Sequence, residues 1–243
     1  MRELIGSFQM WRFASIKDST LLEVNPSYNP GLVLLSLLVA TAAGFAAFLI
    51  VERIRTSESL KMRAVWLLAG SLTMGSGIWA MHFVAMLAAH LPIHMSYDLS
   101  LTVVSVVPAM FGSFAAIYSI SRRHQTHVRL QASALFMALG IGAMHYVGME
   151  AMTGDFILVY KLELFLLSIL VAYALAAISV NIRHIVESWL KSRALTCLFI
   201  SSVVMGGAVC GMHYVAMSSA TFYASGSAIG AGHQDSSAIV VAV

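Results

Sequence analysis

Long apolar stretches alternate with short polar links along this 243-residue chain. An apolar run of about 20 residues is long enough to cross a ~30 Å hydrocarbon core as a helix. Six such runs occupy residues 30–51, 64–88, 99–120, 130–152, 162–181 and 194–218, and a seventh begins at 238 and stops at 243. The pattern predicts an all-α, polytopic membrane helical bundle with six complete transmembrane helices and the start of a seventh.

Composition agrees with this prediction. Charged residues make up 10% of the chain, against about 25% in a typical soluble domain. Residues 1–27 lack the continuous apolar core of a secretory signal, so we expect a short extracytoplasmic segment there, followed by a membrane domain at 28–243. Because the run at 238–243 is too short to span a bilayer, we also expect the chain to be part of a longer protein, with a cytoplasmic output domain after it.

Basic residues in the short links predict the orientation. Ten of the fourteen lie in or beside alternate links, namely Arg53, Arg55, Lys61, Arg63, Arg122, Arg123, Arg129, Arg183, Lys191 and Arg193. The remaining helix-to-helix links hold only Lys161. Cytoplasmic loops are rich in Lys and Arg, so we expect the N-terminus outside and the C-terminus in the cytoplasm. The net charge of +3 reflects topology and does not indicate binding to nucleic acid.

The hydropathy pattern contains an internal repeat with units at about 28–96, 97–159 and 160–236. Tyr28 aligns with Tyr97 and Tyr160, and Ser36 with Ser105 and Ser168. Each unit is predicted to be a helix pair that crosses the membrane twice, so all three keep one orientation. Parallel repeats of this kind are related by an axis along the membrane normal, which would bring equivalent residues to one depth.

The second helix of each unit carries one motif, seen as "MHFVAM", "MHYVGM" and "MHYVAM". Residues at i and i+4 share a face of a helix, so each histidine lies beside the methionine that ends its motif. Counting from the helix starts places all three histidines in the outer half of the bilayer. We therefore predict one metal site with the ligands His82, Met86, His145, Met149, His213 and Met217.

Other sulfur atoms near these motifs are weaker candidates. Met81, Met144 and Met212 point about 100° away from the histidines on their helices. Cys210 could add a thiolate, although a packing role is the simpler interpretation. Cys197 and Cys210 lie 13 residues apart on one helix, a separation of ~20 Å, so no disulfide is expected between them.

Imidazole and thioether donors with no shared carboxylate favour copper. Zinc is the second choice because three histidines and an open position suit it, and haem b held by His and Met is the third. A single buried histidine is more often a packing residue than a ligand, but three copies at one depth favour ligation. We expect His90, His94 and His233, in the outer links, to be solvated. No nucleophile or acid–base pair recurs, so the chain is not expected to be an enzyme.

The three motifs, on alternate helices of this layout, resemble those of the MHYT domain, a bacterial integral-membrane sensor module, and the resemblance covers residues 28–243. The chain departs from the family motif at Val84, Val147 and Val215, which replace its Thr, and at Phe83, which replaces its Tyr. The resemblance implies a copper-binding domain of the bacterial inner membrane that senses a diatomic gas (O2, CO or NO) or redox state. The resemblance also implies a cytoplasmic output domain. In relatives this domain is often an enzyme that makes or degrades cyclic di-GMP, and in others it is a histidine kinase or a DNA-binding domain.

Three functional hypotheses follow. The leading one is a sensor, embedded in the lipid bilayer, whose copper ion or bound gas shifts helix packing in a homodimer and so regulates the output domain. A copper transporter or channel is the alternative, because the helices are rich in methionine, but no second ligand ring is apparent in the inner half, where permeation would need one. An embedded enzyme has the least support.

Overall fold

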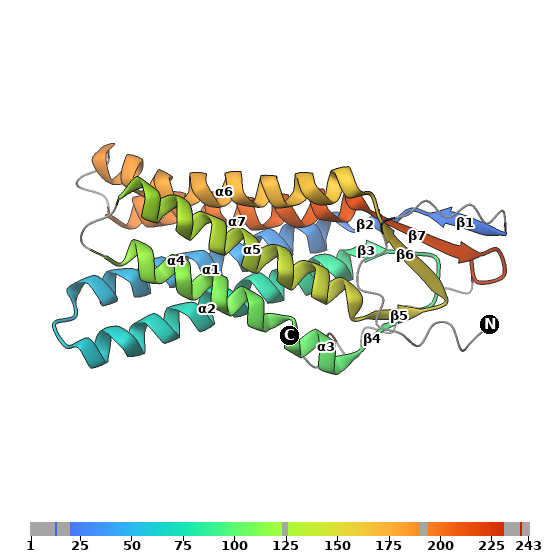
Figure 1. Cartoon of the computed structure of the whole chain (residues 1–243), viewed down its shortest axis with the longest axis horizontal. Helices are drawn as coiled ribbons and strands as arrows, with labels where there is room; N and C mark the ends of the chain where they lie inside the picture. Colours follow the sequence, from blue (N-terminus) through green and yellow to red (C-terminus); the bar gives the residue numbers. More distant parts are fainter. Residues whose placement is uncertain (1–12, 14–19, 123–125, 190–193, 231–238, 240–243) are drawn as a thin grey trace.

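A computed structural model describes residues 13, 20–122, 126–189, 194–230 and 239 of the chain. Six helical spans in these residues are long and apolar enough to cross a membrane, which confirms the predicted all-α polytopic bundle. The helices lie side by side (Figure 1), and their bounds are α1 Pro30–Thr56, α2 Leu60–Ala88, α3 Leu99–Val104, α4 Val106–Ile120, α5 His127–Glu150, α6 Leu162–Trp189 and α7 Ala194–Ser219. The chain is a multi-pass membrane protein.

The third span is divided into α3 and α4 at Ser105. Proline at position 108 has no backbone N–H, so the helical hydrogen bond from residue 108 to the carbonyl of Val104 cannot form. Ser105 keeps a right-handed helical conformation, with φ −60° and ψ −18°, so the span changes little in direction. Ser105, where the break falls, is the buried serine that aligns with Ser36 and Ser168.

Short strands gather at one end of the bundle, opposite the links between α1 and α2, α4 and α5, and α6 and α7 (Figure 1). Their bounds are β1 Leu21–Val24, β2 Ser27–Tyr28, β3 Ala89–His90, β4 Met95–Tyr97, β5 Met152–Gly154, β6 Phe156–Tyr160 and β7 Ala220–Ser225. The hydropathy pattern did not predict them. Three antiparallel pairs form, β2 with β3, β4 with β5, and β6 with β7, and β1 extends the third pair.

Each strand pair closes its helix pair in the same register. Tyr28 lies opposite Ala89, Tyr97 opposite Met152, and Tyr160 opposite Ala220. The residue after each tyrosine then donates its backbone N–H to the last turn of the second helix. These hydrogen bonds run from Asn29 to Ala88 (2.9 Å), from Asp98 to Ala151 (2.8 Å) and from Lys161 to Ser219 (2.9 Å). The fold therefore uses one closing arrangement, here called the strand clasp, three times.

The helix pairs form a closed ring. Within the pairs α1 packs on α2, α4 on α5, and α6 on α7, while α2–α4, α5–α6 and α7–α1 contacts join neighbouring pairs. The second helices of the pairs, α2, α5 and α7, also contact one another. Large apolar side chains such as Leu38, Phe111 and Leu170 remain exposed on the outside, as expected for helices that face lipid.

Glycines allow the helices to approach closely in the interior. A Cβ atom at Gly140 would lie 2.7 Å from the carbonyl oxygen of Pro108 and 2.8 Å from the Cα of Gly112, so α4 and α5 touch through their backbones here. A Cβ at Gly75 would lie 2.7 Å from the Cα of Met110. By contrast, nothing lies within 4 Å of a Cβ at Gly207. Small residues at interfaces are typical of membrane helix packing.

Two predicted segments lie largely outside the described residues. Of the N-terminal segment 1–27, the structure describes Phe13 and the residues from Thr20 onward, and of the predicted seventh helix at 238–243 it describes only Ile239. The boundaries of the three repeat units stay predictions.

The close approach at Gly140 predicts a stability difference between two identical substitutions. Gly140→Ala should lower the stability by about 1–3 kcal/mol, because overpacking forces α4 and α5 apart. Gly207→Ala should be neutral or stabilising by up to about 1 kcal/mol, because alanine favours the helix and meets no neighbour. Thermal unfolding of both variants in one detergent tests this, and equal melting temperatures would contradict the packing at Gly140.

Candidate metal centre

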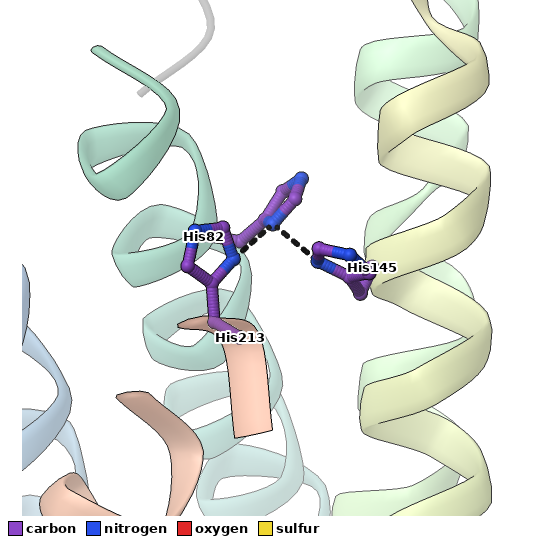
Figure 2. Close-up of side chains that lie close together, drawn as sticks. All are labelled: His82, His145 and His213. Atoms are coloured by element: carbon purple, nitrogen blue, oxygen red, sulfur yellow. Dashed lines mark hydrogen bonds between the residues drawn. The ribbon is translucent and has the colours of Figure 1, made fainter. Parts of the chain in front are cut away.

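His82 on α2, His145 on α5 and His213 on α7 converge in the interior (Figure 2). Each histidine lies six residues before the residue whose carbonyl accepts the clasp hydrogen bond, namely Ala88, Ala151 or Ser219. At 1.5 Å per residue, all three therefore lie ~9 Å from the strand end of their helices. The repeated register brings the imidazoles to one level.

The rings meet through their Nδ1 atoms. The Nδ1 of His82 lies 3.1 Å from that of His213 and 3.2 Å from that of His145, and all three ligand atoms lie within 4.8 Å of one another. Three nitrogens bound at about 2.0 Å to one ion would lie roughly 3.3–3.5 Å apart. The observed spacing of His82 from its two neighbours is thus close to that of a shared ion, and small ring movements would complete it.

The cluster is cut off from solvent. His82 and His145 are 0% exposed and His213 is 1% exposed. Each neutral imidazole carries one proton on one of its two nitrogens, and all three Nε2 atoms are buried without a hydrogen-bond partner in the described residues. Buried polar atoms are normally paired, so three adjacent rings with unpaired nitrogens suggest a missing partner. The ion would lie among the Nδ1 atoms, whose three lone pairs would point at it; every proton would then lie on Nε2, where the described residues offer no acceptor.

Glycine in the second motif makes room for one of the rings. A Cβ at Gly148 would lie 2.6 Å from the Nε2 of His82, so the ring of His82 packs directly against the backbone of α5. The corresponding positions in the other motifs are Ala85 and Ala216. Each histidine also packs edge-on against the aromatic residue that follows it, with centroid distances of 4.7 Å for Phe83, 4.8 Å for Tyr146 and 4.9 Å for Tyr214.

Hydrogen bonds join each motif to the first helix of the next pair. Ser168 and Ser36 each donate their hydroxyl hydrogen to the carbonyl three residues earlier, so their oxygens accept from tyrosine. Tyr146 contacts Ser168 at 2.7 Å, and Tyr214 contacts Ser36 at 3.4 Å. These contacts cross from α5 to α6 and from α7 to α1.

Trp79 makes the third of these connections. Phe83 has no hydroxyl, and the indole Nε1 of Trp79, one turn earlier on α2, donates to Ser105 at 3.0 Å and to the carbonyl of Thr102 at 2.8 Å. Ser105 also donates to Thr102, as its two counterparts do to their own helices. We call these three contacts the aromatic–serine belt. The motif alone did not indicate Trp79, and the signal that could have found it was the missing tyrosine hydroxyl at Phe83.

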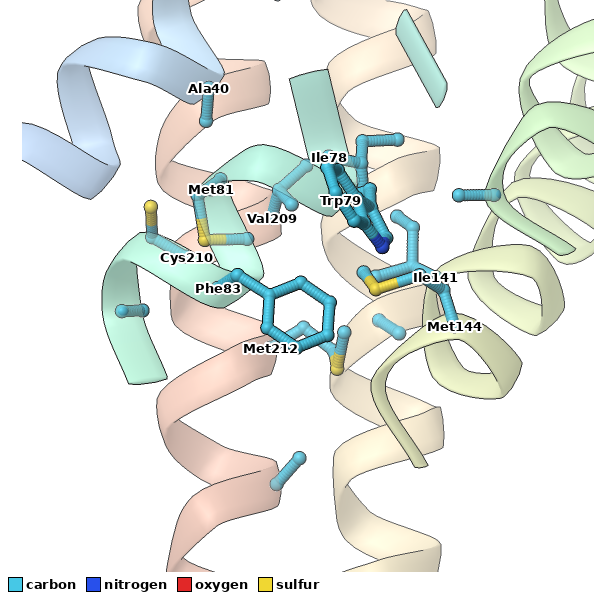
Figure 3. Close-up of a cluster of buried hydrophobic side chains, with 14 of the residues drawn as sticks. Ala40, Ile78, Trp79, Met81, Phe83, Ile141, Met144, Val209, Cys210 and Met212 are labelled. Carbon is cyan, nitrogen blue, oxygen red and sulfur yellow. The ribbon is translucent and has the colours of Figure 1, made fainter. Parts of the chain in front are cut away.

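Met86, Met149 and Met217 follow the histidines by one turn on the same helices and are all buried. Met81, Met144 and Met212 are equally buried, and Figure 3 shows them in the interior with Ile78, Ile141 and Val209. Burial therefore does not distinguish the two sets, and the methionine ligands stay predictions. Cys210 contacts the hydroxyl of Ser36 and does not join the histidine cluster. Both cysteines are free and buried.

A third set of methionines was not singled out by the motif comparison. Met74, Met137 and Met205 each lie eight residues before a histidine, near the middle of α2, α5 and α7. All three line one small cavity of about 20 Å³ together with apolar side chains such as Phe48 and Ile117. The constant spacing from the histidines is the signal that could have revealed them.

Apolar side chains at the strand end of the bundle are fully buried. Leu91, Ile93 and Met95 in the link after α2 are at most 1% exposed, and Phe222 on β7 is 0% exposed. His90 and His94, from the same link, are exposed, as expected for solvated residues. His233 lies outside the described residues. The buried interior at this end of the bundle is therefore largely apolar.

Comparison with known proteins identifies the family of the chain. A family model described as "Bacterial signalling protein N terminal repeat", MHYT, matches residues 75–133 and 139–196, which include the first two motif histidines. The chain belongs to the MHYT family. Its matched region is a sensor region, and similarity to curated relatives extends over most of the chain.

Three relatives of this MHYT chain are signalling proteins. The signaling protein YkoW of Bacillus subtilis is 35% identical over 83% of this chain and 25% of its own length. The cyclic di-GMP phosphodiesterase NbdA of Pseudomonas aeruginosa is 37% identical, covering 79% and 24%. The bifunctional diguanylate cyclase/cyclic di-GMP phosphodiesterase MucR of the same species is 39% identical, covering 81% and 28%. The chain thus spans about a quarter of each relative, and no solved structure matches it.

The aromatic–serine belt predicts unequal effects of two identical substitutions. Tyr146→Phe removes a 2.7 Å hydrogen bond inside the bundle and should cost about 0.5–1.5 kcal/mol. Tyr214→Phe removes a 3.4 Å contact and should cost less. Thermal or denaturant unfolding measures both, with Ser168→Ala as a second way to remove the stronger bond. A larger loss at Tyr214 than at Tyr146 would contradict the geometry.

Proposed function

We propose that this chain is a copper-binding sensory domain that senses a diatomic gas (O2, CO or NO), or redox or copper status, and regulates a cytoplasmic output. The single observation that carries the proposal is the buried group of three histidines whose Nδ1 atoms meet. Buried imidazoles without carboxylate partners form a metal-binding donor set. The expected ligands are His82, His145 and His213, with Met86, Met149 and Met217 as additional donors.

The charge of the site favours monovalent copper over zinc. The free-energy cost of placing an ion in a medium of low dielectric constant grows with the square of its charge, so a divalent ion costs about four times as much. Among the described residues, the cluster contains no carboxylate or thiolate to offset a second charge. Thioethers near the histidines also bind Cu(I) better than Zn(II).

The geometry also argues against haem at this site. The ring centroids of the three histidines lie only 4.9–5.1 Å apart, and two of the Nδ1–Nδ1 distances are near 3 Å. Axial ligands of a haem lie on opposite faces of a wide macrocycle, which would need apolar space around the rings. One compact ion fits between these nitrogens, whereas a porphyrin would force the helices apart.

The burial of the histidines in an apolar interior suits a small, uncharged signal. Diatomic gases pass through hydrocarbon, whereas hydrated ions do not cross it readily. Copper held by three histidines with an open position could bind such a gas or change oxidation state. The relatives NbdA and MucR are named as enzymes of cyclic di-GMP turnover, so we propose cyclic di-GMP synthesis or degradation as the output. We place the domain in the bacterial inner membrane, with the histidine end outside, and expect it to act as a homodimer.

Metal content of the purified protein tests the copper proposal. The wild type should retain stoichiometric copper, and His82→Ala, His145→Ala and His213→Ala should each lose most of it, because each removes one of three nitrogen donors. His90→Ala, which alters an exposed histidine, should retain it. Elemental analysis and circular dichroism of each variant measure copper and folding together.

Transport of copper is a second candidate function, favoured by Met74, Met137 and Met205 around the small mid-bundle cavity. Reconstituted vesicles separate the two: copper-dependent flux through the wild type would support transport, and retained copper without flux would support the sensor. Full copper in all three histidine variants would contradict the sensor proposal.

Exchange of methionine for leucine tests the sulfur ligands. Replacing Met86, Met149 and Met217 together by Leu should weaken Cu(I) binding by about 10- to 100-fold, because leucine keeps the volume but removes the thioether. The same change at Met81, Met144 and Met212 is the matched control and should have little effect. Competition with a Cu(I) chelator measures the affinity of both triple variants. If the control weakens binding more, the assignment of sulfur ligands is wrong.

A further inference from the structure

A large cavity lies at the end of the bundle opposite the histidines. It has a volume of about 510 Å³ and is formed where α1 ends, α2 begins, α4 ends and α5 begins. Cavities of 300–1,000 Å³ are typical ligand sites. Four arginines line it, namely Arg55, Arg63, Arg122 and Arg129, and in the described part of the chain no acidic residue lines it. The copper proposal makes no use of this cavity.

Several of these arginines are held in place by uncharged groups. Arg55 donates to the carbonyl of Ile120 at 2.8 Å, and the Nε of Arg63 donates to the carbonyl of Ser57 at 2.7 Å. The guanidinium of Arg122 lies over the ring of Tyr118 at 4.7 Å. These contacts orient the guanidinium groups of the three arginines. Glu52, which pairs with Arg55 at 3.7 Å, is not part of the lining.

Another part of the cavity lining is apolar. Ile54, Leu60, Ala64 and Leu67 form it, and Leu60 is 80% exposed. The next turns of α2 continue this surface with exposed Val65 and Leu68, which face lipid in a membrane-spanning helix. The cavity therefore combines concentrated positive charge with a hydrocarbon surface that leads into the bilayer.

We propose that this cavity binds the phosphodiester headgroup of an anionic phospholipid. Guanidinium groups recognise phosphate oxygens through charge-assisted hydrogen bonds, and basic pockets between membrane helices on the cytoplasmic side bind such headgroups. The positive-inside pattern places this end in the cytoplasm, where anionic lipid is available. The apolar wall at Leu60 and Leu67 takes the acyl chains, which a soluble phosphodiester lacks.

The location gives the lipid a structural role. Arg55 and Arg63 belong to the first helix pair, and Arg122 and Arg129 flank the link within the second pair. One phosphate that contacts arginines of both helix pairs would join the first pair to the second. This happens at the end of the bundle from which an output domain would continue. The bound lipid therefore stabilises one arrangement of α2 and α5 at this end.

Binding of phosphatidylglycerol to the full-length protein in neutral detergent tests this proposal. Phosphatidylglycerol should raise the melting temperature and remain bound in native mass spectrometry, whereas phosphatidylcholine with the same acyl chains should not. The double variant Arg63→Gln/Arg129→Gln should weaken retention on the order of tenfold. The control Arg53→Gln/Lys61→Gln also removes two charges from this end, but at exposed positions outside the cavity, and should bind as the wild type does.

Two further arms identify the source of the phosphate. Inorganic phosphate and cyclic di-GMP are added in place of lipid, and neither should stabilise the protein. Stabilisation by either one, lost in the cavity double variant, would assign the site to a soluble anion and overturn the lipid proposal. Equal retention of phosphatidylglycerol by the cavity variant and the control variant would overturn it as well. Helical content by circular dichroism confirms that both double variants are folded.

Discussion

Among the residues that the structure describes, the three buried imidazoles have only one another as hydrogen-bond partners, and the repeated helix pairs bring them together. Hydrogen bonds and metal–ligand bonds both weaken steeply when the distance between their atoms changes by a few tenths of an ångström. The three helices must therefore keep their histidines at the same level along the bundle. A slip of one residue along a helix moves a side chain by 1.5 Å and turns it by about 100°. The strand clasp prevents such slips, because in each helix pair one clasp hydrogen bond fixes the backbone six residues after the histidine.

The aromatic–serine belt fixes the rotation of the same helices. Its contacts leave the motif helix one turn or less from the histidine and end on the first helix of the next pair. The indole of Trp79 reaches the serine that Phe83 cannot reach, so the loss of one tyrosine hydroxyl from the motif is offset by a donor one turn away. All three motif helices therefore have a polar link at this place, supplied by a tyrosine in two of them and by Trp79 in the third. The valines that replace the family's Thr carry no hydroxyl, and the histidines converge without one.

Some of these features were predictable from the sequence and others were not. The six spans follow from the length of each apolar run, which is a local property, and the histidines stand out because one motif occurs three times. The strands were missed because they contain two to six residues and form by pairing with distant segments, about 60 residues away for Ser27 and His90 and about 200 residues away for Leu21 and Ser225. Trp79 was missed because its role depends on a serine of another helix. The identity of the ion depends on coordination chemistry, which the spacing of residues along the chain does not determine. The lack of acidic residues in the histidine cluster limits the charge of the ion.

The helices that carry the histidines also connect the two ends of the molecule. α2 begins near Arg63 and α5 near Arg129, at the cavity opposite the histidine cluster, and each reaches its histidine without a break. A change in ligation that moves His82 relative to His145 therefore moves α2 relative to α5 along their whole length. A ligand shifts such an equilibrium only by the difference in its affinity for the two arrangements, and coupling between two sites is reciprocal, typically about 1–3 kcal/mol. An anion held between Arg63 and Arg129 would therefore alter the affinity of the histidine cluster for its ion, and the ion would alter the affinity for the anion by the same factor.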